Sequence, residues 1–181
     1  METRADAPAS PGGLAPGMIE SCGDFSIRIA RDGTWYYHNS PIRRVPLVKL
    51  FASVLRREAD GEYWLVTPAE RGRIEVEDAP FVAVELEVSG QGRDQSLTFR
   101  TNLDDKVVAG ESHPLRVETD AATGEPRPYI LIRPGLEALL LRSVFYHLIE
   151  QGHEATVDDK PQFGVWSTGK FFPLGNLTDV T

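Results

Sequence analysis

One order of sequence patterns occurs twice in this chain, about ninety to one hundred residues apart. The first occurrence starts where apolar and polar residues alternate from Phe25 to Ala30. Asp32 and Gly33 then supply residues that tolerate the positive φ angles of a tight turn, and the aromatic run 35–38 follows. This pattern predicts a β-hairpin.

A helix and two strands follow this hairpin in the sequence. Apolar residues recur at helical spacing after Pro46, which suits the first position of a helix, and Asp60 and Gly61 predict its end. The apolar stripe consists of Leu47, Leu50, Phe51, Val54 and Leu55. Two short runs rich in β-forming residues, 63–66 and 73–77, predict two strands.

The second occurrence has the same order. Leu115 and Val117 alternate with polar residues, and Tyr129–Ile132 completes a second hairpin across a longer loop. A second helix is predicted from Pro134 to Gly152, with an apolar face of Leu136, Leu140, Val144 and Leu148. The run 163–167 then resembles 63–67, and a separate hairpin is predicted between the two occurrences, at 81–88 and 96–100.

The repeat predicts an α+β fold with two small domains, each an antiparallel sheet with a helix, related by duplication. We expect a disordered tail at 1–18, an N-terminal domain at 19–78 and a C-terminal domain at 79–181. The tail is rich in Ala, Pro and Gly and has no aromatic residue, so it has little apolar surface to bury.

The net charge limits the kinds of molecule that the protein is expected to bind, and the cysteine content indicates the cellular compartment. The chain has 19 Lys or Arg and 27 Asp or Glu, a net charge of −8, most of it in the C-terminal domain. Nucleic-acid and anionic-membrane surfaces are bound by basic faces, so neither partner is expected. The single cysteine, Cys22, and the absence of a long apolar run or a signal peptide predict a cytoplasmic protein.

No motif for catalysis is complete. The segment 164–170 fits the phosphate-binding loop pattern up to its last position, where Phe171 stands instead of the hydroxyl residue that holds magnesium. The four histidines have no metal-binding spacing and no cysteine partners. We therefore expect no catalytic residues, no metal site and no cofactor.

The remaining polar residues in predicted loops are candidates for binding a small anion. Arg43, Arg44 and Arg133 precede the predicted helices, whose free N–H groups favour negative charge. Hydrogen-bonding and stacking groups that could complete the walls of such a site are His38, Asn102, Asp104, His113 and Trp166. Ordinary turns and ion pairs, and core packing for Trp166, explain such residues more often than a ligand site does.

Several short segments together resemble the bacterial family called domain of unknown function 1285. They are Trp35–Arg44, Tyr63–Pro68, Phe99–Asn102, His113–Arg116, Pro126–Tyr129 and Gly164–Ser167. The resemblance runs from about Gly23 to Gly175. It implies two α+β domains that arose by duplication, the second superficially like a pleckstrin-homology fold, with a pocket for a nucleotide-like ligand at their interface and a role in signalling. The family has no established catalytic residues to transfer.

Three functional hypotheses follow. The leading one is a non-catalytic cytoplasmic module that binds a nucleotide-like or phosphorylated small molecule between its domains. The second is a hydrolase that uses His113 with Asp104, which requires the two side chains to meet in one cleft. The third is a protein-interaction module that pairs through exposed strands. The sequence names no protein partner.

Overall fold

The structure, a computed structural model, describes residues 21–176, so the predicted tail at 1–18 lies outside the described part. Residues 21–76 form a six-stranded sheet with one helix. Its elements are β1 (Ser21–Ile29), β2 (Trp35–Tyr37), β3 (Ser40–Pro41), α1 (Val45–Ser53), β4 (Leu55–Arg57), β5 (Tyr63–Val66) and β6 (Arg71–Val76). The strand order is β3-β2-β1-β6-β5-β4, and only β1 and β6 pair in parallel.

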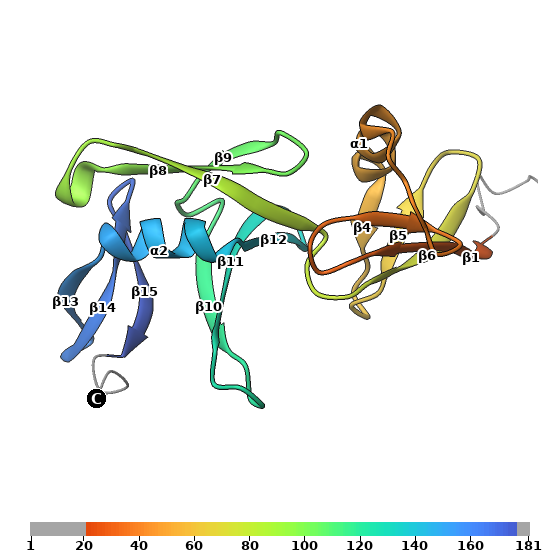
Figure 1. The fold of residues 1–181 in the computed structure, drawn as a ribbon. Helices are drawn as coiled ribbons and strands as arrows, with labels where there is room; N and C mark the ends of the chain where they lie inside the picture. The colour runs from red at the N-terminus through yellow and green to blue at the C-terminus, as the bar shows by residue number, and fades with distance from the viewer. Residues whose placement is uncertain (1–20, 177–181) are drawn as a thin grey trace, which may run out of the picture.

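The rest of the described chain forms a second six-stranded sheet, a helix and a three-stranded sheet. The elements are β7 (Phe81–Ser89), a 3-10 turn (Gly92–Asp94), β8 (Ser96–Thr101), β9 (Lys106–Val108), β10 (Leu115–Thr119), β11 (Pro126–Arg133), β12 (Leu136–Leu140), α2 (Arg142–Glu150), β13 (His153–Val157), β14 (Lys160–Ser167) and β15 (Lys170–Asn176). Figure 1 shows this C-terminal domain beside the N-terminal one, with β7 extending from the junction.

The two six-stranded sheets have the same strand order. In the second sheet the order is β10-β11-β12-β7-β8-β9, and the central pair, β12 and β7, is again parallel. Strands β7 to β12 therefore occupy the places of β1 to β6, about sixty residues later in the chain. Both six-stranded sheets are mixed, whereas the sheet of β13, β14 and β15 is antiparallel. Strands dominate both domains, and each domain has one α-helix among the described residues.

The repeat seen in the sequence, at a spacing of ninety to one hundred residues, does not correspond to the relation between the two six-stranded sheets. Three strands, a helix and three strands occur at 21–76, and the same succession occurs at 115–176. In the first copy the two triplets join in one sheet through β1 and β6. In the second copy, β12 joins the earlier strand β7, and β13 to β15 form a sheet of their own. The hairpin predicted between the two occurrences, at 81–88 and 96–100, therefore belongs to the second six-stranded sheet as β7 and β8.

The predicted second helix is wrong in its first half. Residues 136–140 form the buried strand β12, and α2 begins only at Arg142. Leucines four residues apart fit one face of a helix and also one face of a strand, because four is a multiple of the two-residue strand period. Pairing with β11 and β7 on both sides decides in favour of the strand.

The first helix is also shorter than predicted. It ends at Ser53, and the residues expected to form its last turns, 55–57, form the edge strand β4. Leu55 is buried in either arrangement and so contributes to both patterns. As strand residues, the two arginines that follow Leu55 lie along an edge of the sheet.

One apolar core extends through both domains. It includes Ile29, Trp35 and Leu65 of the first sheet together with Phe81 and Phe99 of the second, all almost completely buried. The connection from β6 to β7 is itself packed, since Ala79 is buried. No helix among residues 21–176 is long and apolar enough to cross a membrane.

Candidate functional site

A hollow of about 400 Å³ lies where the N-terminal domain meets the turn between β11 and β12. Its walls come from both domains: the end of α1 and strand β4 on one side, and the β11–β12 turn on the other. The lining residues are Ser53, Leu55, Arg56, Arg57, Glu58, Arg133, Pro134 and Leu136. We call this hollow the junction pocket.

Strand β4 brings two arginines to the junction pocket. Arg57 lies opposite Tyr63 in the sheet, with its guanidinium carbon 5.3 Å from the centre of that ring. Its Nε donates a hydrogen bond to the carbonyl of Gly61 at 3.3 Å. Gly135 packs closely on Arg57: a Cβ at this position would lie 3.2 Å from the Cβ of Arg57. The β11–β12 turn therefore needs a glycine here, both for this close approach and for its φ of +73°.

Arg133 reaches the junction pocket from the end of β11. Its Nη2 donates a hydrogen bond of 2.7 Å to the carbonyl of Ala52, in the last turn of α1. Its guanidinium carbon lies 5.4 Å from the centre of the Phe81 ring. The Nε of Arg133 is buried and has no hydrogen-bond partner. A buried N–H without an acceptor is energetically costly.

The electrostatics of the junction pocket favour an anion. Three guanidinium groups line it, and its one carboxylate, that of Glu58, is shared with Arg71 at 3.6 Å. Arg56 and Arg57 form no ion pair within the described residues. Positive charge that converges from two domains, with few carboxylates to neutralise it, is suited to phosphate or carboxylate recognition.

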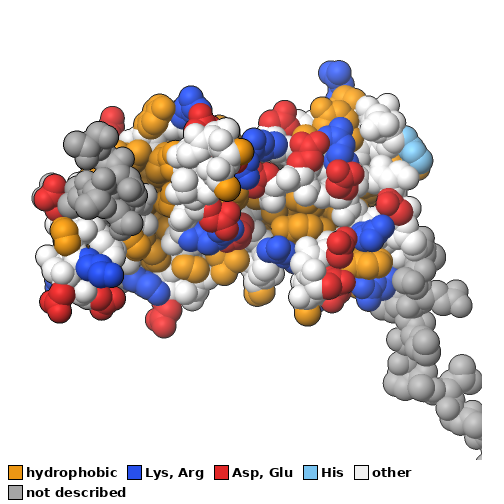
Figure 2. Space-filling model, turned by 90° about the horizontal axis from the view of Figure 1, so that it is seen from below, with side chains coloured by type: hydrophobic (Ala, Val, Ile, Leu, Met, Phe, Trp, Pro, Cys, Tyr) orange, Lys and Arg blue, Asp and Glu red, His pale blue; other side chains and the backbone are white. Residues whose placement is uncertain are grey.

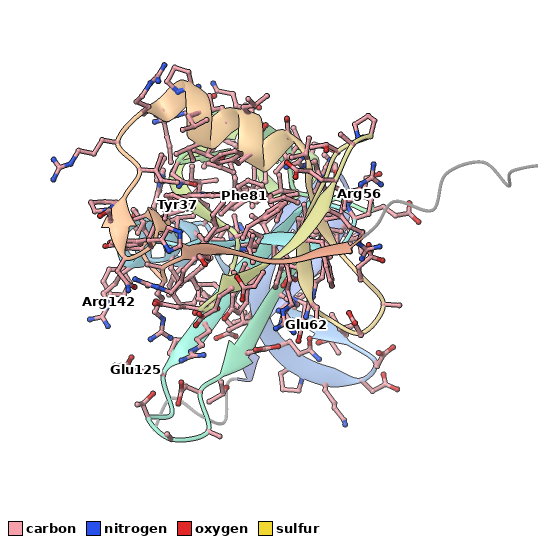
Figure 3. All side chains as sticks on the ribbon, turned by 90° about the vertical axis from the view of Figure 1, so that its right-hand side faces the viewer. Tyr37, Arg56, Glu62, Phe81, Glu125 and Arg142 are labelled. Atoms are coloured by element: carbon pink, nitrogen blue, oxygen red, sulfur yellow. The ribbon has the colours of Figure 1, made fainter. Side chains whose placement is uncertain are left out.

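A second hollow, of about 550 Å³, lies between α2 and the β10–β11 hairpin. Its charged residues already have partners: Arg127 with Asp120 at 2.6 Å, and Arg142 with Glu125 at 3.8 Å. Figure 3 shows the labelled Arg142 and Glu125 next to each other. With its charges paired, this hollow has no feature that demands an anion.

Of the three predicted arginines, only Arg133 lines the junction pocket. Its predicted place at the start of a helix is wrong, because it ends strand β11. Arg43 and Arg44 do stand at the start of α1, where Arg44 is the N-cap residue, but both are exposed and neither lines the pocket. The structure thus separates the predicted arginine cluster into two places.

Asn102 and Asp104 connect the two domains. The Oδ1 of Asn102 accepts a hydrogen bond from the backbone N–H of Val82 at 3.1 Å, and its Nδ2 donates to the carbonyl of Gly33 at 3.4 Å. Asp104 pairs with Lys49 of α1 at 2.7 Å and with Arg100 at 3.2 Å. The hydrogen bond and charge of Lys49 lower the pKa of Asp104. Neither residue lines the junction pocket.

The remaining candidates lie apart from the junction pocket. The Nδ1 of His113 is 2.9 Å from the carbonyl oxygen of Leu131. The ring of Trp166 stacks with Arg93, whose guanidinium carbon lies 4.5 Å from the ring centre. His38 is exposed in the turn between β2 and β3. No hydrogen bond joins His113 to Asp104 in the part of the chain that the structure describes, and each has another partner, so the two do not form a catalytic pair in this geometry.

The sequence reasoning missed Arg56 and Arg57. They fell within the predicted helix, where adjacent arginines are ordinary solvent-facing residues. An available signal was the pair of consecutive arginines immediately after the buried Leu55. Among residues 21–176 no cluster of His, Cys, Asp or Glu could hold a metal ion.

Comparison with known proteins assigns the family. Residues 18–79 match the family model described as domain of unknown function (DUF1285), N-terminal domain. Residues 80–174 match the model described as protein of unknown function (DUF1285), C-terminal domain. The chain belongs to the DUF1285 family. The resemblance inferred from the short motifs is thereby confirmed, and the organisation in two domains agrees with the pair of family models.

Solved structures of DUF1285 proteins share this fold. The chain is similar to a DUF1285 family protein from Silicibacter pomeroyi DSS-3, with 49% identity, a TM-score of 0.83, and coverage of 94% of this chain and 92% of that one. A DUF1285 family protein from Shewanella baltica OS155 is 27% identical, with a TM-score of 0.54 and coverage of 68% and 90%. No curated protein matches the chain.

Proposed function

We propose that this DUF1285 protein is a non-catalytic module that binds a small phosphorylated molecule in the junction pocket. The observation that carries the proposal is that Arg56 and Arg57 of the N-terminal domain and Arg133 of the C-terminal domain line one pocket, with Glu58 as the one carboxylate among the lining residues. A phosphate group in the pocket would be attracted by the guanidinium of Arg133. Arg56 and Arg57 would share the negative charge.

The size and chemistry of the junction pocket set the ligand class. About 400 Å³ can hold a phosphate group with a small organic body, such as a mononucleotide or a sugar phosphate. The buried side chains of Leu55 and Leu136 provide an apolar floor, and Glu58 offers an acceptor for a hydroxyl or amino group. These features support a nucleotide-like ligand over a bare inorganic ion.

A thermal-shift titration tests the proposal. Adenosine 5′-monophosphate and ribose 5-phosphate should raise the Tm in a concentration-dependent way, whereas adenosine, which lacks the phosphate, should not. The double substitution Arg56→Gln/Arg57→Gln should abolish the shift. The matched substitution Arg43→Gln/Arg44→Gln changes the charge equally, outside the pocket, and should preserve it.

Two results would overturn the site. One is the absence of any shift across a panel of nucleotides and phosphorylated metabolites. The other is an equal loss of the shift in both double variants, which would indicate general charge attraction rather than binding in the junction pocket.

We also propose a cytoplasmic signalling role, and domains that arose by duplication, the second of them related to pleckstrin-homology domains. The common strand order of the two six-stranded sheets supports the duplication. A single cysteine is compatible with a reducing compartment. A ligand that binds between two domains can favour one relative arrangement of the domains over another, and a signalling module requires such a response. The net charge of −8 disfavours nucleic-acid and membrane partners.

A further inference from the structure

The hollow between α2 and the β10–β11 hairpin has an apolar lining. Three of its lining residues, Pro128, Leu140 and Phe145, are buried. Two others on α2 are open to solvent, since Tyr146 is 57% exposed and Ile149 is 36% exposed. We call this hollow, of about 550 Å³, the α2 pocket. Its volume lies within the range of small-molecule sites and leaves room for an aromatic side chain.

The residues that α2 contributes to the α2 pocket lie on one stripe of the helix. At about 3.6 residues per turn, Arg142, Phe145, Tyr146 and Ile149 fall within about 100° of one another around the helix axis. Arg142 is the first residue of the helix, and the apolar residues follow it along the stripe. One side of α2 therefore brings apolar surface and a guanidinium group to the same space.

The opposite wall is the end of the β10–β11 hairpin, and its loop is held in place by Asp120. The Oδ1 of Asp120 accepts hydrogen bonds from the backbone N–H groups of Ala122 at 2.9 Å and Thr123 at 3.0 Å. Its Oδ2 pairs with Arg127 at 2.6 Å. Because these contacts fix the hairpin before a ligand arrives, ordering this wall adds little entropic cost to binding.

Two opposite charges lie at the rim of the α2 pocket, one from each wall. The Nη2 of Arg142 on α2 is 3.8 Å from the Oε1 of Glu125 on the hairpin, and the two side chains are 72% and 66% exposed. Figure 3 shows the two side chains next to each other. Since 3.8 Å is too long for a hydrogen bond, each group keeps hydrogen-bonding capacity for a ligand.

The backbone of the hairpin wall favours a small molecule over an extended peptide. The backbone hydrogen bonds at the two ends of the β10–β11 ladder show that the odd-numbered residues of β11 face β10. The backbone groups of Pro126 and Pro128 therefore face away from β10, and both residues line the α2 pocket. Proline has no N–H to donate, so an added strand would find no donor along this stretch.

We propose that the α2 pocket binds an apolar α-amino acid in its zwitterionic form. The carboxylate of the ligand pairs with Arg142, its ammonium group pairs with Glu125, and its side chain covers Tyr146 and Ile149. The two charges of an α-amino acid lie close together, as do those of Arg142 and Glu125, so the four charges can alternate in sign. A ligand with a single charge is attracted by one of these groups and repelled by the other. The proposal does not depend on the junction pocket.

Isothermal titration calorimetry of the full chain with L-phenylalanine tests the proposal. L-Phenylalanine should bind at least about fivefold more tightly than 2-phenylethylamine, which lacks the carboxylate, or 3-phenylpropionate, which lacks the ammonium group. L-Serine keeps both charges but has no apolar side chain, and it should also bind at least about fivefold more weakly. Amide chemical shifts should change at α2 and at the β10–β11 hairpin.

Substitutions of exposed residues assign the contacts. Arg142→Gln should weaken the binding of L-phenylalanine by about fivefold or more without weakening that of 2-phenylethylamine, and Ile149→Ser should weaken the binding of both. One matched control is Arg73→Gln, since Arg73 forms a similarly exposed pair with Glu62 at 3.9 Å in the N-terminal domain. The other is Leu50→Ser on α1, where Leu50 is 61% exposed. Both controls should change the affinity by less than about twofold.

The proposal fails in any of three cases. L-Phenylalanine gives neither saturable heat nor amide shifts at α2. 3-Phenylpropionate binds as tightly as L-phenylalanine, which would show that the α2 pocket does not recognise a zwitterion. Arg142→Gln and Arg73→Gln weaken binding equally, which would place the ligand elsewhere. Because the test of the junction pocket uses phosphorylated ligands and the Arg56 and Arg57 variant, either proposal can fail without the other.

Discussion

At the scale of single residues, the junction between the domains is held by polar groups with defined partners. The side chain of Asp78 is only 8% exposed and accepts a hydrogen bond from Nε of Arg31 at 3.1 Å. The hydroxyl of Tyr129 donates to the other oxygen of Asp78 at 2.7 Å. A residue of the linker between the sheets is thereby tied to both domains.

Tyr129→Phe should lower the free energy of unfolding by about 1–3 kcal/mol, because it removes a hydrogen bond to a buried carboxylate. Urea denaturation monitored by tryptophan fluorescence measures this change. Tyr146→Phe is the control, since Tyr146 is 57% exposed, and it should leave stability nearly unchanged. Equal stability of wild type and Tyr129→Phe would contradict the assigned role of this hydroxyl.

Burial, followed by the hydrogen bond to Asp78, raises the pKa of Tyr129 to about 12. The neutral phenol is therefore favoured in the folded state. Its contribution to stability is complete below the unfolded pKa of about 10 and is lost as the pH rises toward 12. The difference in unfolding free energy between wild type and Tyr129→Phe should accordingly shrink across this interval. A constant difference would show that Tyr129 does not titrate there.

At the scale of elements, the third sheet depends on a close approach between β14 and β15. Gly164 of β14 is buried, and a Cβ there would clash with the carbonyl oxygen of Phe172 on β15. Backbone atoms within a paired strand cannot move aside as a flexible side chain can. A glycine is therefore required at this position by packing rather than by its φ angle.

Gly164→Ala should destabilise the protein by about 1–3 kcal/mol or more, because the added methyl group must push the two strands apart. Gly175→Ala, in the same sheet, should be tolerated, since a Cβ at Gly175 meets no atom within 4 Å. Thermal denaturation of the two variants makes the comparison. Similar Tm values would show that β14 and β15 can separate without cost.

At the scale of the whole molecule, the two domains share one apolar core. Phe81 and Ile29 belong to different sheets, are fully buried and lie in the same cluster. Asn102 connects the start of β7 with the β1–β2 turn through its two hydrogen bonds. Figure 2, a view from below, shows acidic and basic side chains interspersed over both domains, with no large patch of one charge on this face.

Unfolding should therefore occur in one cooperative transition. In differential scanning calorimetry the calorimetric and van't Hoff enthalpies should agree, as expected for a single folding unit. Asn102→Ala should lower the Tm while the transition remains single. Two separate transitions in the wild type would indicate that the domains fold independently and that the shared core adds little.

Local structure was largely predictable from the sequence, and its assembly was not. The β1–β2 hairpin follows directly from the alternation around Phe25 and the turn at Asp32 and Gly33. The strand at 136–140 was predicted as helix because its leucine spacing satisfies both periods. Among the site residues, Arg133 was predicted and Arg56 and Arg57 were missed, because their place on an edge strand depends on where α1 ends.

The sequence by itself determined the family, the two-domain organisation and most strands, because these depend on residue patterns within short windows. Only the tertiary structure decided which triplets of strands share a sheet, since that choice depends on contacts between residues far apart in the chain. The same reason applies to the junction pocket. Arg56 and Arg133 are 77 positions apart in the sequence, and only the packing of one domain against the other places them around a common space.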